Sequence, residues 1–141
     1  MATAVTTLTA TAQTAAPLFQ RALPNIEGKT FTSVIVEFPP GPGAAPHRHG
    51  AAFVWAYVLA GTMRIKLNDE PTRTYREGES WFEEPVTHHV IAQNPSTTEP
   101  AKVLTVFISN TGDELKVDTP GNQPRWDPAE LVTNKAGPRL C

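Results

Sequence analysis

Hydrophobic and polar residues alternate along the middle of the chain with the period of two that is typical of β-strands. In residues 31–38, Val34, Val36 and Phe38 fall on one face and the residues between them fall on the other. Residues 62–67 show the same alternation. Short segments with alternating, aromatic or β-branched residues predict further strands at 53–59, 72–76, 80–84, 88–92 and 101–109.

Glycine and proline separate these segments. The run 39–43 is made of prolines and glycines only, which ends any regular element. Ala60 and Gly61 predict a tight turn that joins 53–59 to 62–67 in a hairpin with one buried face. Strands about ten residues apart with such turns between them are typical of an all-β sandwich or a small antiparallel β-barrel.

The two ends of the chain differ from its middle. Residues 1–17 are rich in Ala and Thr and carry no charge, which predicts a flexible or extended N-terminal arm, or an edge strand added to a partner subunit. Residues 18–118 would form the barrel domain, and the proline-containing residues 119–141 an irregular C-terminal tail with one short helix around 127–132. We expect a homodimer with the arm or residues 31–38 at its interface.

The composition excludes several classes of protein. With 141 residues, the chain is long enough for one domain with its own core. Its 12 Lys and Arg against 14 Asp and Glu give a net charge of -2, which argues against a nucleic-acid partner. Cys141 is the only cysteine, which excludes an intramolecular disulfide and a Cys-based zinc site. Since no segment reads as a signal peptide or a membrane span, we expect a cytoplasmic protein without a membrane partner.

The four histidines occur in two groups, His47 with His49 and His88 with His89. In a strand, residues i and i+2 point to the same face, so His47 and His49 would project side by side. Imidazole is the commonest protein ligand for metals, and two on one face need a third donor from a neighbouring strand. Either His88 or His89 could supply it, and the other would then be surplus. The alternative is an exposed pair and a hydrogen-bonded turn.

Two stretches resemble the signatures of the cupin superfamily. Residues 43–61 resemble the first signature, with a glycine, then His47-x-His49, then a turn glycine. Residues 78–94 resemble the second signature. His89, and not His88, stands eleven positions after the glycine at 78, as the signature requires. The resemblance implies a small antiparallel β-barrel of the jelly-roll-like, double-stranded β-helix type that is usually dimeric. It also implies a metal bound in the mouth of the barrel by His47, His49 and His89.

The sequence departs from the cupin pattern at four positions. The glutamate expected at 54 is Val54, the proline expected at 84 is Glu84, and the glycine expected at 86 is Val86. The asparagine comes one place late, at Asn94. The ligand set is thereby reduced to three histidines, which resembles the all-histidine cupins, among them gentisate and thiol dioxygenases and the acetylacetone-cleaving dioxygenase. Three neutral ligands leave the charge of a divalent metal uncompensated, which favours anionic, chelating substrates.

Glu83 is the candidate catalytic residue. It precedes His89 by six positions, an even offset that would place both on one face unless Pro85 resets the alternation. A carboxylate there resembles the supporting glutamate of the acetylacetone-cleaving enzyme. It could orient a ligand, accept a proton from the substrate, or replace the missing glutamate as fourth ligand. The alternative is a solvated turn charge beside Glu84.

Tyr57 and Trp81 are the candidates for substrate contact among the aromatic residues, because strand parity allows each to face the pocket. Most other aromatic residues at such spacings belong to the core.

These observations lead to two hypotheses of function. The first is a metal-dependent enzyme acting on a small chelating or anionic organic molecule, above all a non-haem iron(II) dioxygenase. Iron(II) is favoured over manganese, nickel, copper and zinc. A variant of it is an isomerase, cyclase or decarboxylase that uses the metal as a Lewis acid and Glu83 as a base. The second hypothesis is a cupin that binds a small ligand without turnover. A zinc site for hydrolysis is a weaker third.

Overall fold

The computed structural model describes residues 13–118. These residues form strands and connecting segments, and none of them is helical. The strands are β1 (Thr14–Ala22), β2 (Lys29–Phe38), β3 (Gly41–Ala44), β4 (His47–Arg48), β5 (Phe53–Ala60), β6 (Thr62–Leu67), β7 (Arg73–Arg76), β8 (Ser80–Glu83), β9 (His88–Asn94), β10 (Ala101–Asn110) and β11 (Val117–Asp118).

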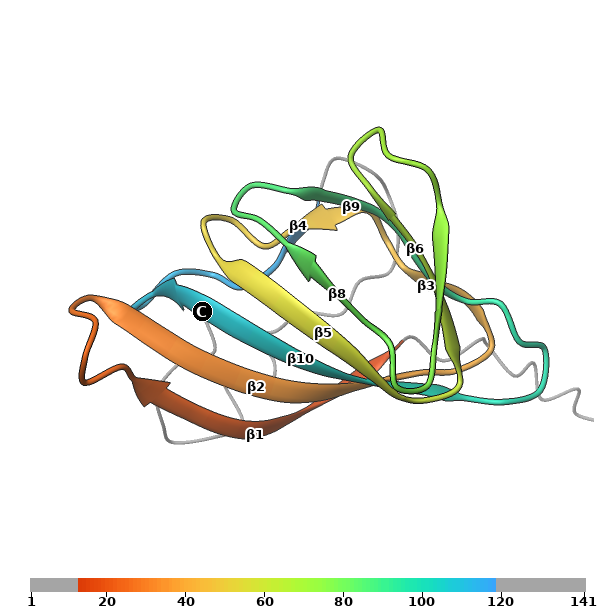
Figure 1. Ribbon diagram of the computed structural model, residues 1–141, viewed down its shortest axis with the longest axis horizontal. Coiled ribbons are helices and arrows are strands. Elements are labelled where there is room, and N and C mark those ends of the chain that lie inside the picture. Colours follow the sequence, from red (N-terminus) through yellow and green to blue (C-terminus); the bar gives the residue numbers. More distant parts are fainter. Residues whose placement is uncertain (1–12, 119–141) are drawn as a thin grey trace, which may run out of the picture.

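Two antiparallel sheets lie face to face (Figure 1). The first has the strand order β1-β2-β10-β5-β8. The second has the order β11-β4-β9-β6-β7, and β3 also pairs with β9. The predicted all-β, double-stranded β-helix architecture is thereby confirmed.

The core lies between the sheets and follows the alternation seen in the sequence. On β2, Val34, Val36 and Phe38 are buried, and on β6 Met63 and Ile65 are buried. Side chains of the same cluster come from β5, β8, β9 and β10 as well. Because β2 and β6 each turn one face inward, the period-two pattern was sufficient to find these core positions.

The hairpin predicted around Ala60 and Gly61 is wrong. β5 pairs with β10 and β8, whereas β6 pairs with β9 and β7, so the turn carries the chain from one sheet to the other. Gly61 has φ +79°, and a Cβ added there would lie 2.8 Å from the carbonyl oxygen of Pro100. A two-residue turn between apolar segments has the same sequence pattern in a hairpin and in a turn between two sheets. The sequence alone therefore could not distinguish these two arrangements.

The expected boundary of the N-terminal arm needs correction. β1 begins at Thr14 and pairs with β2 of the same chain, with Thr14 opposite Glu37. The boundary expected after residue 17 therefore falls inside a strand, and this edge strand belongs to the chain's own sheet. Residues 1–12 and 119–141, with the helix expected at 127–132, lie outside the described residues, and the homodimer stays a prediction. No helix among the described residues is long and apolar enough to cross a membrane.

The turn between β8 and β9 contains a strained residue. Val86 has φ +62°, a left-handed conformation that a β-branched residue rarely adopts. Its N–H donates to the carbonyl of Gly50 at 2.7 Å, and its own carbonyl accepts from Nη1 of Arg48 at 2.8 Å. These bonds hold Val86 in the conformation that a glycine, expected here from the cupin pattern, adopts without strain.

We expect Val86→Gly to raise the free energy of unfolding by about 1 kcal/mol, because it removes the steric cost of the left-handed conformation. Val117 in β11 is a matched control, since it is also exposed and Val117→Gly should destabilise through backbone entropy. Denaturant titration of both variants measures the difference. An equal loss of stability in the two variants would contradict the strain at Val86.

Candidate metal centre

Two neighbouring strands bring the histidines together. In the antiparallel pair of β4 and β9, His47 lies directly opposite His89, and Arg48 lies opposite His88. Residues opposite each other point to the same face, so His47 and His89 point inward together while His88 points to the other side. His49 follows β4 by one residue and completes a buried group in which one ring nitrogen from each histidine lies within 4.8 Å of the others.

Backbone carbonyls fix the orientation of two of the rings. Nδ1 of His47 lies 2.7 Å from the carbonyl oxygen of Ala45, and Nδ1 of His49 lies 2.6 Å from that of Leu115. A carbonyl can only accept, so each Nδ1 carries the hydrogen and each Nε2 presents a bare lone pair. The two Nε2 atoms are 3.2 Å apart. Two facing lone pairs repel each other unless a cation lies between them.

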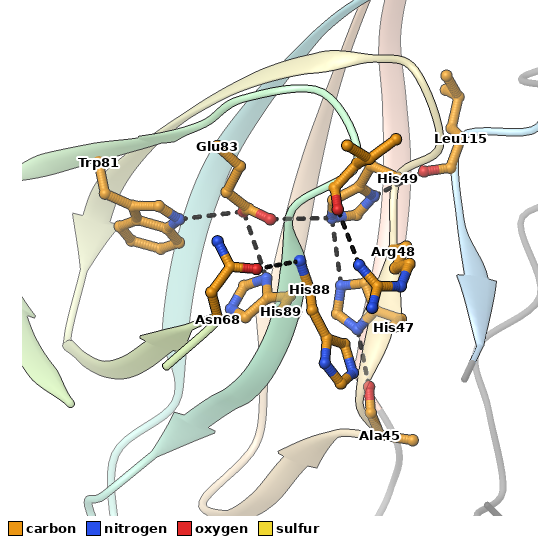
Figure 2. Close-up of polar contacts among 11 residues, drawn as sticks. Ala45, His47, Arg48, His49, Asn68, Trp81, Glu83, His88, His89 and Leu115 are labelled. Atoms are coloured by element: carbon orange, nitrogen blue, oxygen red, sulfur yellow. Dashed lines mark hydrogen bonds and ion pairs between the residues drawn. The ribbon is translucent and has the colours of Figure 1, made fainter. Parts of the chain in front are cut away.

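Glu83 extends the histidine group (Figure 2). Its Oε1 lies 3.7 Å from Nε2 of His49, and its Oε2 lies 3.3 Å from Nδ1 of His89. Oε2 also accepts a hydrogen bond of 3.2 Å from Nε1 of Trp81. Among the described residues, Oε1 of Glu83 and Nε2 of His89 are buried without a hydrogen-bond partner. Buried polar atoms are rarely left in this state unless a ligand satisfies them.

The carboxylate comes from an unexpected strand. Glu83 on β8 lies directly opposite Val54 on β5, and Val54 occupies the position of the glutamate in the cupin pattern. Opposite residues share a face and have Cβ atoms about 5 Å apart. Glu83 can therefore place its carboxylate in the region that a side chain at position 54 would reach. It is 3% exposed, so the alternative of a solvated turn charge is wrong.

The protonation states suit a metal. Burial lowers the pKa of His47 well below its usual value, and the nearby His49, His89 and Lys116 lower it further. Burial also lowers the pKa of His49, although Glu83 opposes this. Burial alone would raise the pKa of Glu83, but His89, His49 and Trp81 outweigh it and hold this pKa at about 2. At neutral pH His47 and His49 therefore offer neutral imidazoles, and Glu83 offers an anionic carboxylate.

The donor set fits a divalent metal ion. Two ligand atoms that are each about 2.1 Å from a metal lie roughly 3.0–3.4 Å apart in octahedral or tetrahedral geometry. The distances of 3.2 Å between the two Nε2 atoms and 3.7 Å between Glu83 and His49 are close to this range. His47, His49 and His89 could hold the ion, with Glu83 beside them.

The group lies at the wall of a small cavity between the sheets. The free volume for the centres of water-sized molecules is about 50 Å³, enough for a few waters or one small ligand. Apolar residues make up most of the wall, and the polar residues are Gln13, His47, His49, Glu83, His89, Thr105 and Lys116.

The two candidate aromatic residues take different places. Trp81 lines the cavity and holds Glu83. On β5, Ala56 lines the cavity, so Tyr57 lies on the opposite face of that strand, where its ring is 5.8 Å from that of Trp55. The structure therefore does not bring Tyr57 to the candidate site, because the odd-numbered residues of β5 point away from it.

Sequence reasoning missed Gln13, Thr105 and Lys116. Thr105 follows the alternation of β10 and could have been found from parity. Gln13 and Lys116 stand outside the main strands, at either end of the described chain, and carry no local pattern that indicates a cavity.

We expect the metal-free protein to lose stability as the pH falls below about 6.5, the ordinary pKa of histidine. The pKa values of His47 and His49 are lowered in the folded state, so the unfolded chain binds protons that the folded chain does not. The free energy of unfolding therefore decreases as the pH is lowered. The decrease is up to about 1.4 kcal/mol per pH unit for each histidine that stays neutral in the folded state. Denaturant titrations at pH 7.5 and 5.5 measure it. Equal stability at both values would contradict the lowered pKa values.

The cupin domain family matches residues 34–107, about half of the chain. The chain therefore belongs to the cupin family. No curated protein sequence matches it.

Similar solved structures have the same fold. A DMSP lyase from Ruegeria pomeroyi has a TM-score of 0.57 at 20% identity, over 65% of this chain and 45% of the lyase. A cupin domain from Schizosaccharomyces pombe has a TM-score of 0.57 at 16% identity, over 70% of this chain and 66% of that one. An oxalate oxidase has a TM-score of 0.56 at 22% identity, over 74% of this chain and 55% of the oxidase. The chain thus spans less than two-thirds of the length of each, and identities this low establish the fold alone.

Proposed function

We propose that this chain is a metal-dependent enzyme acting on a small chelating or anionic organic molecule, and that it is a non-haem iron(II) dioxygenase. The observation that carries the proposal is the buried group of bare imidazole nitrogens with one carboxylate oxygen at the wall of a small cavity. Imidazole and carboxylate donors suit iron(II). Bound iron would supply the redox chemistry that lets substrate and oxygen react.

The chain's own residues have separate tasks in this proposal. The carbonyls of Ala45 and Leu115 hold His47 and His49 with Nε2 toward the centre, as supporting hydrogen bonds do for metal ligands in general. Glu83 acts as the fourth donor. Trp81 occupies one oxygen of that carboxylate, which leaves Oε1 directed toward His49. The apolar wall excludes bulk water and restricts the substrate to a small molecule.

A second candidate is an isomerase, cyclase or decarboxylase in which Glu83 accepts a proton and the metal acts as a Lewis acid. The proximity of Glu83 to the cavity supports it. Similar structures include enzymes named a lyase and an oxidase, which favours catalysis over ligand binding without turnover. Zinc in place of iron would favour hydrolysis instead.

Metal analysis of anaerobically purified protein, followed by measurement of oxygen uptake, tests the proposal. We expect about one iron per chain and oxygen uptake with at least one of 2,4-pentanedione, gentisate and 3-mercaptopropionate. The His49→Ala variant is the control and should show neither. Bound iron with no oxygen uptake would favour the Lewis-acid reaction. Absence of any bound metal would refute the proposal.

A further inference from the structure

The two sheets differ on the sides that face away from the core. Every residue of β5 in the first sheet is apolar or aromatic, and Phe53, Trp55 and Leu59 point outward and are exposed. On β6 of the second sheet, the corresponding outward residues are Arg64 and Lys66. A strand that is apolar on both faces is typical of one that is covered on both sides. The sequence of β5 therefore indicates that a partner covers the outer side of the first sheet.

The strands beside β5 continue this apolar surface (Figure 1). Trp55 lies opposite Phe82 on β8 and opposite Val106 on β10. On the same side, Leu104 of β10 lies opposite Ile35 of β2. Opposite residues share a face of the sheet, so these side chains form one continuous patch. We call it the outer apolar face, and it consists of Ile35, Phe53, Trp55, Phe82, Leu104 and Val106.

The outer apolar face is large enough to form the core of a dimer interface. Phe53, Trp55 and Phe82 are 40%, 37% and 56% exposed. Since aromatic side chains have about 150–250 Å² each, these three rings alone expose roughly 300 Å². The half-buried residues of the face and the exposed Leu59 add to this area. A standard interface buries about 800 Å² per partner, and its rim is polar. Exposed apolar patches of several hundred Å² mark interaction sites.

A second copy of this chain covers the face better than the chain's own terminal segments would. Residues 1–12 contain three large apolar side chains, and residues 119–141 contain four, which five charged residues and four prolines accompany. Neither segment has the six large apolar side chains that the face presents. About a two-fold axis, the same face of a second copy supplies an equal number and an equal area. Two sheets pack face to face in this way about 10 Å apart.

We propose that two copies of this chain associate through the outer apolar face, sheet against sheet about a two-fold axis. The proposal does not depend on the proposed function, because the face and the cavity lie on opposite sides of the sheet. Strand β8 is common to both. Phe82 faces outward, whereas its neighbours Trp81 and Glu83 line the cavity. Since β8 is an edge strand that pairs with β5, packing of Phe82 on the second copy would also hold the strand that carries Glu83.

The mass of the full-length chain in solution, measured by light scattering and sedimentation over a range of concentrations, tests the proposal. We expect a dimer at micromolar concentration. Trp55→Lys and Phe82→Lys should each raise the dimer Kd by at least about 30-fold, the effect of losing a central aromatic residue. Ile26, in the turn between β1 and β2, is also exposed, and Ile26→Lys is the matched control that should leave the Kd unchanged. Far-UV circular dichroism checks that each variant is folded.

Two further variants distinguish the outer apolar face from the terminal segments. Loss of the dimer in Leu8→Lys with retention in Trp55→Lys and Phe82→Lys would place the interface on the N-terminal segment instead. A monomeric wild-type chain would overturn the proposal. If such a monomer begins to associate in Trp126→Lys, the C-terminal segment covers the face. A dimer that tolerates both lysine substitutions on the face would equally overturn it.

Discussion

His49→Ala is expected to abolish binding of the metal, whereas His88→Ala should keep more than half of it. Nε2 of His49 lies 3.2 Å from Nε2 of His47 and 3.7 Å from Oε1 of Glu83, so it is central to the donor group. Its loss should reduce metal affinity by more than the roughly 10- to 100-fold typical of residues that only support a ligand. His88 lies opposite Arg48 on the other face of β9.

The two substitutions make a matched pair because both remove one imidazole from the same small domain. Metal content after dialysis, measured by elemental analysis, gives the result. His49→Ala also removes the hydrogen bond to Leu115, so far-UV circular dichroism should accompany it, and His47→Gln provides a second variant of the same group. Stoichiometric metal in His49→Ala would refute the assignment. Loss of metal in His88→Ala with retention in His89→Ala would exchange the roles of these neighbours.

The strands with one buried face could be predicted, whereas the short strands β3, β4 and β11 could not, and β3 even lies in the proline and glycine run. β2 and β6 show this best, since Val34, Val36, Met63 and Ile65 are all buried as their spacing indicates. The pairing of the strands could not be predicted in the same way. Ala60 and Gly61 join two different sheets. β5 pairs with β10 and β6 pairs with β9, and both partner strands lie far away in the sequence.

The candidate site was predicted in part. The His-x-His spacing and the count from the glycine at 78 both point to the residues that the structure brings together. The face on which Glu83 lies could not be predicted, because the sequence does not show whether Pro85 interrupts the alternation between Glu83 and His89. The register that sets Glu83 opposite Val54 is a property of the sheet. Tyr57 has the right chemistry for a pocket but lies on the outer face of β5. Lys116 directly precedes the short strand β11, which no periodicity indicates.

The carboxylate of Glu83 on β8 and a carboxylate placed at position 54 on β5 should support metal binding in the same way. We expect Glu83→Gln to weaken metal binding by about 10- to 100-fold, an effect of the size that even supporting residues produce, because the amide cannot offset the charge of the metal. Since Val54 and Glu83 are opposite residues on one face, a glutamate at 54 should reach the same donor group. The double variant Val54→Glu, Glu83→Val should therefore recover most of the lost affinity.

Metal content and turnover measured on the same preparations distinguish the roles of Glu83. Glu84→Gln is the matched control, because this neighbouring carboxylate is exposed and should change neither quantity. If Glu83→Gln keeps its metal but loses turnover by about 10²- to 10⁴-fold, Glu83 acts in proton transfer instead of ligation. If both quantities stay unchanged, the three histidines are the whole site. Recovery in the double variant would show that this chain keeps the carboxylate of a cupin metal site and supplies it from the neighbouring strand.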